Sequence, residues 1–288
     1  MRRLAALWLT CLLGLPLSGC AGWDAWQRQH VYRPTGLPQA QWQAFLAEHP
    51  DFSATQVPLA GGGHLQILHM PAVPGRRSAV RVLYLHGTLR HVIGNLAKIR
   101  GITRNGLDVD AVDYRGWGAA SELLPDEASL HADAMQAWRA LRAADVAGAS
   151  WVIYGHSMGS ALAVRLAADL GRQPAGDYCA LVLESAFTRF PDIARSAGGP
   201  LGPLAAALTT QQMDSLSHIG EVHGPIWMLH GREDRTVPIE LGRRLFEAAP
   251  EPRQWLDLPG EHSDLQDDGS GRYDRVWQEV KQHCAAAS

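Results

Sequence analysis

The sequence predicts an α/β fold with a mostly parallel, twisted sheet of about eight strands and helices on both faces. Two observations support this prediction. From about residue 51 onward, short apolar stretches rich in β-branched residues alternate with amphipathic helical stretches. In addition, a G-x-S-x-G sequence at 155–159 stands between a strand-like and a helix-like stretch. The length of 288 residues, of which 46% are hydrophobic, fits one sizeable domain with a short appendage.

The start of the chain has the organisation of an export leader. Arg2 and Arg3 precede an apolar stretch at 4–17 that is too short to span a bilayer stably. The stretch ends Leu-Ser-Gly-Cys at 17–20, which resembles a bacterial lipobox. This resemblance implies a signal peptide at 1–19 and an acylated Cys20 as the first mature residue. A plain secretory peptide cleaved at a small residue is the alternative.

The lipobox resemblance also implies a location. Several acyl chains would hold the protein at a membrane, because each buried methylene contributes about 0.8 kcal/mol. Ala21 follows Cys20, which is similar to the pattern of lipoproteins sorted to an outer membrane. We therefore expect a lipid-anchored protein of the bacterial cell envelope, at the outer membrane and facing the periplasm.

Residues 20–50 differ from the rest of the chain. They contain tryptophans at 23, 26 and 42 but no strong periodicity. Leu37 to His49 is predicted as one short helix with an apolar face. We interpret the segment as a tether that packs onto the domain, and a substrate-binding arm is the alternative.

The domain at 51–288 is predicted to begin with an antiparallel hairpin, because three glycines at 61–63 join its first two strands. The predicted strands are 54–60, 64–70, 80–86, 107–113, 150–153, 179–184, 225–230 and 254–258. The predicted helices are 92–104, 126–143, 160–170, 239–248 and 273–283. One long connection remains, between Phe187 and Ile219, and it carries an Ala/Leu-rich patch.

The G-x-S-x-G stretch has the features of a nucleophile elbow. Gly155 and Gly159 allow a tight, strained turn, and that turn lifts the Ser157 hydroxyl clear of the sheet. Asp234 and His262 follow later strands in the same way, so all three side chains lie at the carboxyl ends of strands, where such sheets bind ligands. A serine needs an adjacent base, and that base must be oriented by a carboxylate. The order Ser, Asp, His therefore predicts a hydrolytic triad.

Six short sequences together resemble the α/β-hydrolase superfamily, in its compact esterase, lipase and thioesterase branch. The resemblance covers about residues 57–284 and rests on His-Gly-Thr at 86–88, Asp-Tyr-Arg-Gly-Trp-Gly at 113–118, Gly-His-Ser-Met-Gly at 155–159, Glu-Ser-Ala-Phe at 184–187, the acid loop at 231–238 and Gly-Glu-His at 260–262. It implies an α/β-hydrolase fold with a small cap insertion at about 187–219.

The same resemblance implies roles for individual residues. Ser157 would be the nucleophile, His262 the general base and then acid, and Asp234 the carboxylate that orients the imidazole. The oxyanion hole maps onto the backbone N–H groups of Met158 and Thr88. The implied activity is hydrolysis of carboxylic esters or thioesters of small or acyl substrates. Leu89, Arg90 and His91 follow Thr88, where many relatives have a glycine, and their bulk could narrow the acyl pocket.

Other polar residues near the strand ends compete for these roles. Glu184 is the alternative triad acid, because it also ends a strand. The remaining candidates are given structural roles: backbone hydrogen bonding for His86 and His230, packing for His156, a carboxylate beneath the turn at 115–116 for Asp113, and a solvated loop for Asp264, Asp267 and Asp268. Glu233 adjoins Asp234 but does not occupy the position of the acid in the resemblance.

The composition of the chain restricts the classes of partner and cofactor that we expect it to bind. The net charge of −3, which becomes −5 once Arg2 and Arg3 leave with the signal peptide, and the lack of a basic stripe exclude nucleic acid. We find no zinc-like ligand spacing and no phosphate-binding glycine loop, so no metal and no cofactor are predicted. Cys179 and Cys284 remain after Cys11 and Cys20 are assigned to the leader and the lipid. They either form a disulfide or stay as two separate buried cysteines.

Three other functions are compatible with the sequence. The chain could be a catalytically silent hydrolase-like lipoprotein that serves as a binding module in the envelope, although silent relatives commonly lose one member of the triad. It could be a peptidase with the same triad, because one fold supports several reactions. A cofactor-free haloperoxidase-like activity would use the same three residues.

Overall fold

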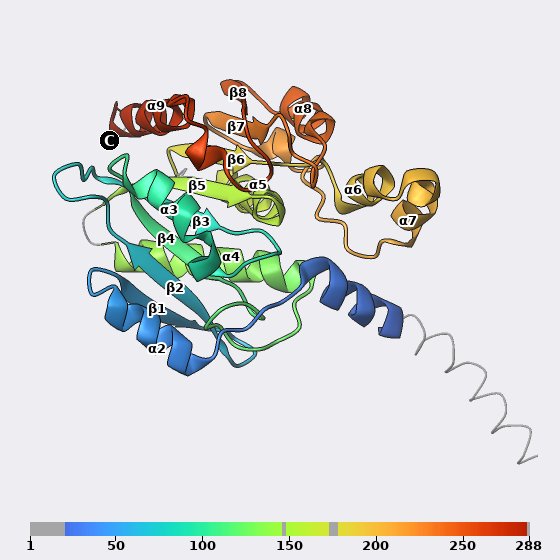
Figure 1. Cartoon of the computed structure of the whole chain (residues 1–288), viewed down its shortest axis with the longest axis horizontal. Helices are drawn as coiled ribbons and strands as arrows, with labels where there is room; N and C mark the ends of the chain where they lie inside the picture. Colours follow the sequence, from blue (N-terminus) through green and yellow to red (C-terminus); the bar gives the residue numbers. More distant parts are fainter. Residues whose placement is uncertain (1–20, 146–147, 173–177, 287–288) are drawn as a thin grey trace, which may run out of the picture.

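The computed structural model describes residues 21–145, 148–172 and 178–286. In these residues, eight strands form one twisted sheet in the order β1-β2-β4-β3-β5-β6-β7-β8 (Figure 1). The strands are Ser53–Pro58 (β1), His64–Met70 (β2), Val80–Leu85 (β3), Asp108–Asp113 (β4), Ser150–His156 (β5), Ala180–Glu184 (β6), Ile226–Gly231 (β7) and Arg253–Leu258 (β8). β2 is antiparallel to β1 and β4, and all other pairs are parallel. The predicted α/β fold and the leading hairpin are confirmed.

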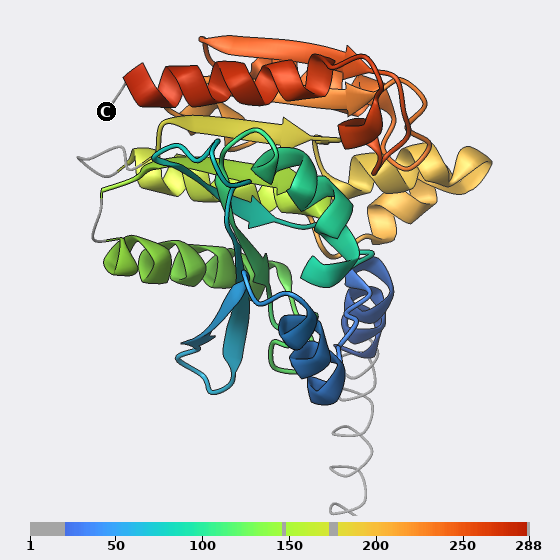
Figure 2. The same cartoon turned by 60° about the vertical axis from the view of Figure 1, so that its left-hand side comes forward.

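Helices cover both faces of the sheet (Figures 1 and 2). The longer ones are Gln39–Glu48 (α2), Leu96–Thr103 (α3), Glu127–Ala144 (α4), Met158–Gly171 (α5), Phe190–Ala197 (α6), Gly202–Leu208 (α7), Ile239–Ala248 (α8) and Arg272–Ala286 (α9). Short 3-10 turns are Val92–Asn95 (η1), Gly199–Leu201 (η2), Ile219–Glu221 (η3) and Leu265–Asp267 (η4). One buried core contains side chains of α4, α5 and α8, and the other those of α2, α3 and α9.

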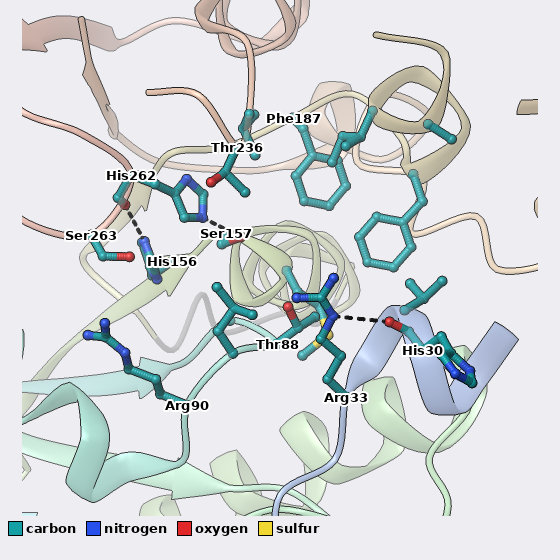
Figure 3. Close-up of a pocket in the computed structure, with 18 of the residues that line it drawn as sticks. His30, Arg33, Thr88, Arg90, His156, Ser157, Phe187, Thr236, His262 and Ser263 are labelled. Atoms are coloured by element: carbon teal, nitrogen blue, oxygen red, sulfur yellow. Dashed lines mark hydrogen bonds between the residues drawn. The ribbon is translucent and has the colours of Figure 1, made fainter. Parts of the chain in front are cut away.

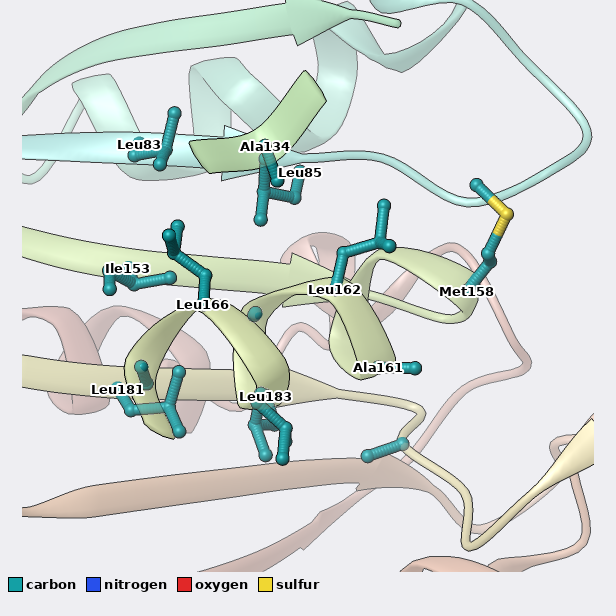
Figure 4. Packing of buried hydrophobic residues seen from close by; sticks show 14 of the residues in the cluster. Leu83, Leu85, Ala134, Ile153, Met158, Ala161, Leu162, Leu166, Leu181 and Leu183 are labelled. Carbon is teal, nitrogen blue, oxygen red and sulfur yellow. The ribbon is translucent and has the colours of Figure 1, made fainter. Parts of the chain in front are cut away.

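Helix α5 fixes the elbow against the middle of the sheet. Its Leu162 and Leu166 point toward the strands, among side chains such as Leu85 of β3 and Leu183 of β6 (Figure 4). Leu162 is fully buried, and burying one leucine contributes about 1.5–3 kcal/mol. The approach is close, because a Cβ placed on Gly159 would lie 2.1 Å from the carbonyl oxygen of Leu85. A glycine is therefore required there for the helix to begin so near β3.

The long connection after β6 folds into the predicted cap region. It holds α6, η2 and α7, which lie beyond the carboxyl ends of the strands (Figure 2). Prolines stand in the first turn of α6 and α7, where a missing backbone N–H costs no helical hydrogen bond.

The segment before the domain packs onto it at two places. Residues 21–32 are helical, and the α2 helix follows with Trp42 and Phe45 buried. Within the first helix, Trp23 Nε1 donates to the carbonyl oxygen of Leu208 at 3.2 Å, which ties the segment to the end of the cap. Arg28 Nη2 donates to the carbonyl oxygen of Leu124 at 2.8 Å. The N-terminal segment therefore packs onto the domain.

A disulfide joins Cys179 and Cys284, whose Cα atoms lie 5.3 Å apart. Cys179 directly precedes β6 and Cys284 belongs to α9, so the bond closes a sequence separation of 105 residues at the end of the sheet opposite the cap. Of the two alternatives for these cysteines, the disulfide is confirmed.

The predicted signal peptide at 1–19 and Cys20 lie outside the described residues. Among the helices that are described, none has both the length and the apolar character needed to cross a bilayer.

Candidate active site

Ser157 occupies a strained turn between β5 and α5. Its backbone angles are φ 55° and ψ −123°, a conformation that L-residues rarely adopt. The neighbouring strand β6 stabilises the turn, because the Ser157 N–H donates to the carbonyl oxygen of Glu184 at 2.9 Å. Gly87 approaches from the end of β3, and a Cβ there would lie 3.0 Å from that of Ser157. The elbow predicted from the glycine pattern is therefore present.

His262 lies between Ser157 and Asp234. The Ser157 hydroxyl is 2.9 Å from His262 Nε2, and His262 Nδ1 is 2.8 Å from Asp234 Oδ2 (Figure 3). A carboxylate only accepts, so Nδ1 carries the proton and Nε2 is free to take one from the serine. These three residues follow β5, β7 and β8. The arrangement can transfer a proton from a serine hydroxyl to an oriented imidazole.

The loop after β7 keeps Asp234 ionised. Oδ1 accepts the backbone N–H groups of Thr236 and Val237 at 2.9 and 2.8 Å, and His230 Nε2 lies 3.4 Å from Oδ2. Burial by itself raises the pKa of Asp234, but the hydrogen bonds from His230, His262 and Val237 outweigh it and hold the pKa well below its ordinary value. Asp234 is therefore negatively charged wherever the protein is folded near neutral pH.

His156 and Ser185 hold the backbone of His262. His156 Nε2 donates to the His262 carbonyl oxygen at 2.8 Å, and Ser185 Oγ donates to the same oxygen at 3.3 Å. Burial, followed by the nearby charges of Lys98 and His262, lowers the pKa of His156 well below its ordinary value. The packing role predicted for His156 thus includes a specific hydrogen bond, which no spacing in the sequence indicated.

Glu184 is engaged elsewhere. Lys98 Nζ of α3 contacts Glu184 Oε1, and the Tyr154 hydroxyl donates to Oε2 at 2.7 Å. Glu184 is 0% exposed and Lys98 is 2% exposed, so this is a buried ion pair. The structure therefore places Asp234 against His262 and keeps the alternative acid in the core.

Met158 and Thr88 both border the same cavity as Ser157. Met158 is the first residue of α5, where backbone N–H groups have no partner within the helix. The N–H of Ser157 itself is already used by Glu184, which leaves Met158 as the nearest donor along the chain. The backbone of Thr88 is held in place by a side chain, because Trp117 Nε1 donates to the Thr88 carbonyl oxygen at 3.1 Å.

A cavity of about 320 Å³ opens beside Ser157 and is mostly apolar on the cap side (Figure 3). The cap contributes Phe190 and Ile193, and Phe187 precedes them. His30 and Arg33 also line it, so the N-terminal segment forms part of the wall. The N-terminal segment therefore both packs onto the domain and borders this cavity, the position that a substrate-binding arm requires.

The other strand-end residues have structural partners. His86 Nδ1 lies 2.6 Å from the carbonyl oxygen of Gly87, and His230 Nε2 lies 3.0 Å from that of Val237, as the sequence predicted. Asp113 is structural, as predicted, and lies against the end of the turn, because a Cβ on Gly118 would be 1.8 Å from its Oδ2. Its Oδ1 accepts the N–H of Val92 at 2.7 Å, whereas the Arg115 guanidinium pairs with Asp133 of α4. The long-range pairing depends on where α4 lies, which local sequence does not specify.

Two carboxylates brace the histidine loop. Glu233 Oε2 accepts the N–H of Gly260 at 2.6 Å, and Asp264 Oδ1 accepts the N–H of Glu261 at 2.7 Å. Asp264 is exposed, as expected for a solvated loop, and its side chain makes this one backbone hydrogen bond in addition. In the part of the chain that the structure describes, no group of three or more His, Cys, Asp or Glu side chains is arranged to hold a metal ion.

Comparison with known proteins places this geometry in context. Residues 77–198 match the family model of serine aminopeptidase S33. An uncharacterized protein of Mycobacterium tuberculosis is 32% identical over 266 residues, covering 90% of this chain and 89% of that protein. Lysophosphatidylserine lipase ABHD12 of Danio rerio is 28% identical over 190 residues, covering 60% of this chain and 48% of the lipase.

Solved structures agree in fold. An α/β hydrolase of Vibrio vulnificus has a TM-score of 0.71 at 19% identity, covering 88% of this chain and 92% of that one. The Pyrococcus furiosus esterase Pf2001 has a TM-score of 0.63 at 16% identity, covering 81% of this chain and 91% of that one. Together with the sequence relatives and the eight-stranded sheet of the described residues, these matches show that the chain is an enzyme of the α/β-hydrolase superfamily.

Proposed function

We propose that this protein is a serine hydrolase that cleaves carboxylic ester or thioester bonds of acyl substrates through an acyl-enzyme intermediate. The observation that carries the proposal is the hydrogen-bonded series Ser157, His262, Asp234 beside an apolar cavity. The relatives named as an esterase and a lysophosphatidylserine lipase support the same class of substrate.

The proposed reaction has two halves. Ser157 Oγ attacks the acyl carbon while His262 Nε2 takes its proton, and the carbonyl oxygen becomes an oxyanion between the N–H groups of Met158 and Thr88. The C–O or C–S bond then breaks, and His262 returns the proton to the leaving alcohol or thiol. Water attacks the acyl-enzyme in the same way, releasing the acid and restoring Ser157. Removing one oxyanion donor in such enzymes lowers turnover about 100-fold or more.

A series of p-nitrophenyl acyl esters tests this proposal. The wild-type protein is expected to hydrolyse them and to react stoichiometrically with a fluorophosphonate probe. Ser157→Ala is expected to lose both properties while keeping the melting temperature of the wild type. Hydrolysis by Ser157→Ala at a rate close to wild type would remove Ser157 from its role. A wild-type protein that neither hydrolyses the esters nor takes up the probe would instead favour a silent binding module.

The peptidase alternative has one specific difficulty. An aminopeptidase must accept a free α-ammonium group, and such a cation is normally paired with a carboxylate. The described residues that line the cavity include Arg33 and Arg90 but no Asp or Glu. We therefore favour ester over aminopeptidase substrates. Aminoacyl p-nitroanilides, assayed beside the esters, separate the two.

We further propose that Met1 to Gly19 is removed as a signal peptide and that acylated Cys20 anchors the protein to the outer membrane, facing the periplasm. Two observations support this. The Cys179–Cys284 disulfide suits an oxidising compartment. There is also an exposed apolar surface. It consists of two residues that closely follow Cys20 in the chain and three residues of the cap: Trp23, Trp26, Leu201, Leu204 and Leu208. Trp23 contacts Leu208 directly, so the two parts of this surface adjoin.

Labelling with radioactive palmitate tests the anchor. The full chain expressed in a Gram-negative host is expected to incorporate label and to fractionate with the outer membrane. Cys20→Ser is expected to lose the label. Cys11→Ser is the matched control, because Cys11 lies in the predicted leader and its loss leaves labelling intact. Equal labelling of the Cys20→Ser protein would contradict the proposal.

A further inference from the structure

The N-terminal helix and the end of the cap together carry an exposed apolar surface. Its members, which we call the Trp–Leu surface, are Trp23, Trp26, Leu201, Leu204 and Leu208. They are five of the nine large hydrophobic side chains that are exposed in the described part of the chain, and Leu201 has the largest exposed fraction, 69%. Exposed apolar side chains that gather in one place mark a surface that binds a protein, a ligand or a membrane.

The two parts of the Trp–Leu surface are continuous. Trp23 and Trp26 stack with their ring centroids 5.0 Å apart, and Trp23 Nε1 donates to the carbonyl oxygen of Leu208 at 3.2 Å. The three leucines follow one another at intervals of three and four residues, the spacing that places side chains on one side of a helix. Figures 1 and 2 show the helix at 21–32 and α7 at the same end of the molecule.

Charged side chains do not interrupt this surface. On the cap side, the sequence from Ser196 to Met213 contains no Asp, Glu, Lys, Arg or His. On the helix side, Asp24 adjoins Trp23, but its Oδ1 already accepts hydrogen bonds from Thr210 Oγ1 and Gln211 Nε2, each at 2.9 Å. The surface therefore offers hydrophobic contact and aromatic rings, which suits an apolar occupant.

The position of this surface in the chain points to a lipid bilayer as the occupant. Trp23 comes three residues after Cys20, the proposed site of acylation. Because one residue spans at most about 3.6 Å, Cys20 lies within about 11 Å of Trp23. Acyl chains on Cys20 would therefore hold the Trp–Leu surface against the bilayer. Tryptophan is enriched at the boundary between lipid and water, and interfacial helices bury their apolar face about 5–10 Å into it.

The Trp–Leu surface also adjoins the cavity beside Ser157. Trp26 stacks on His30 with ring centroids 4.3 Å apart, and His30 lines the cavity. On the cap, Leu208 is followed directly by Thr209, which lines the cavity as well. A bilayer in contact with the surface would therefore lie beside the cavity, and an acyl chain dissolved in that bilayer would have a short path to Ser157.

We infer that the Trp–Leu surface docks onto the lipid bilayer and that the enzyme takes its acyl substrates from that bilayer. The docking rests on the proposed anchor at Cys20 for its occupant, and the supply of substrate rests on the proposed ester hydrolysis. A lipid anchor alone leaves the domain free to take any orientation above the membrane. The Trp–Leu surface selects the orientation in which the cap and the N-terminal helix face the lipid.

Quenching of tryptophan fluorescence by brominated lipids tests the docking. The full chain, expressed in a Gram-negative host, is incorporated into vesicles of phosphatidylethanolamine and phosphatidylglycerol, with or without bromine on the acyl chains. Bromine quenches a tryptophan only at close range, so the wild type is expected to lose fluorescence in the brominated vesicles. Trp23→Phe/Trp26→Phe keeps the surface apolar and is expected to show much less quenching, because the other described tryptophans are buried or half-buried.

Leucine variants test the supply of substrate. Leu201→Ser/Leu204→Ser is expected to lower kcat/KM about 10-fold for p-nitrophenyl dodecanoate carried in the vesicles, because two side chains no longer enter the lipid. The kcat/KM for water-soluble p-nitrophenyl butyrate should not change, since neither leucine lines the cavity. Val73→Ser is the matched control. It removes an exposed hydrophobic side chain from outside the Trp–Leu surface and should leave both values unchanged.

The outcomes separate the docking from the two proposals on which it rests. Equal quenching in the wild type and in Trp23→Phe/Trp26→Phe overturns the docking, and palmitate labelling of the same protein would leave the anchor standing. Equal activity of Leu201→Ser/Leu204→Ser and Val73→Ser on the vesicle-borne ester overturns the supply of substrate from the bilayer. A wild-type protein that hydrolyses neither ester overturns the proposed function, while the quenching still decides the docking.

A second copy of the chain is the competing occupant. Light scattering in nonionic detergent measures the mass of the wild type and of Leu201→Ser/Leu204→Ser. A wild-type dimer that the leucine variant converts to a monomer would make the Trp–Leu surface an interface between copies and would overturn the docking onto lipid. The same mass for both proteins, together with quenching by brominated lipids, supports the bilayer as the occupant.

Discussion

Two carboxylates near the ends of adjacent strands have opposite surroundings. Asp234 follows β7 and accepts from His262, from His230 and from the backbone of its own loop. Glu184 ends β6, is fully buried, and binds Lys98 and Tyr154 in the core. Both positions satisfy the sequence rule that a triad acid follows a strand. The comparison shows that the position of His262, set by the loop after β8, decides which of the two carboxylates belongs to the site.

Glu184 still contributes to the site through its backbone. Its carbonyl oxygen accepts the N–H of Ser157, while its side chain is fixed by Lys98. Lys98 also contacts Gln266 Oε1 at 3.2 Å, in the η4 turn that follows His262. The buried pair therefore supports two of the loops that meet at the cavity. We expect its loss to affect stability first and catalysis second.

Asp234→Asn tests the first half of this comparison and should have the largest effect. The amide cannot fix the Nδ1–H tautomer of His262 or stabilise its protonated form, so kcat for a p-nitrophenyl ester should fall about 10⁴-fold. Circular dichroism and the melting temperature check that the fold is retained. Glu184→Gln is the matched variant, and its kcat should fall far less. The assignment of the acid is reversed if Glu184→Gln loses more activity than Asp234→Asn.

Glu184→Gln tests the second half, through stability. The change leaves the Lys98 ammonium buried without a charged partner, which costs about 3 kcal/mol in comparable pairs. Urea denaturation measures the free energy of unfolding. The double variant Lys98→Met/Glu184→Gln removes both charges and should recover much of the loss. If Glu184→Gln alone is as stable as the wild type, Lys98 and Glu184 do not form the buried ion pair described above.

His156 gives the smallest effect, and it depends on pH. Because burial lowers the pKa of folded His156, the unfolded chain binds a proton there that the folded chain does not. The stability from neutral His156 is therefore complete above the unfolded pKa of about 6.5 and is lost as pH falls toward the folded pKa.

Replacing His156 by Gln should flatten this dependence. Between about pH 6.5 and 5, the free energy of unfolding of the wild type should fall more steeply than that of His156→Gln, by up to about 1.4 kcal/mol per pH unit. Urea denaturation at several pH values provides the two slopes. Parallel slopes would indicate that His156 binds its proton equally in the folded and unfolded states.

The sequence was informative where local pattern and chemistry coincide. Alternating strands and helices predicted the sheet, and the glycines around Ser157 predicted the elbow, because a turn of that kind needs glycine at those positions. It was uninformative where distant segments meet. No spacing relates His156 to the carbonyl of His262, or Asp113 to the N–H of Val92, since each contact depends on how loops from separate strands are stacked.

What the sequence by itself determined is the order of the elements and the candidates Ser157 and His262, with Asp234 or Glu184 as the carboxylate, because backbone propensities and reactive side chains are properties of short segments. Tertiary structure alone decided which carboxylate reaches His262 and that Cys179 bonds Cys284. It also decided that Arg33, 124 residues before the elbow serine, lines the same cavity. The physical reason is that these contacts join segments far apart in the chain, and their free energy exists only once the sheet and both its helical layers are packed.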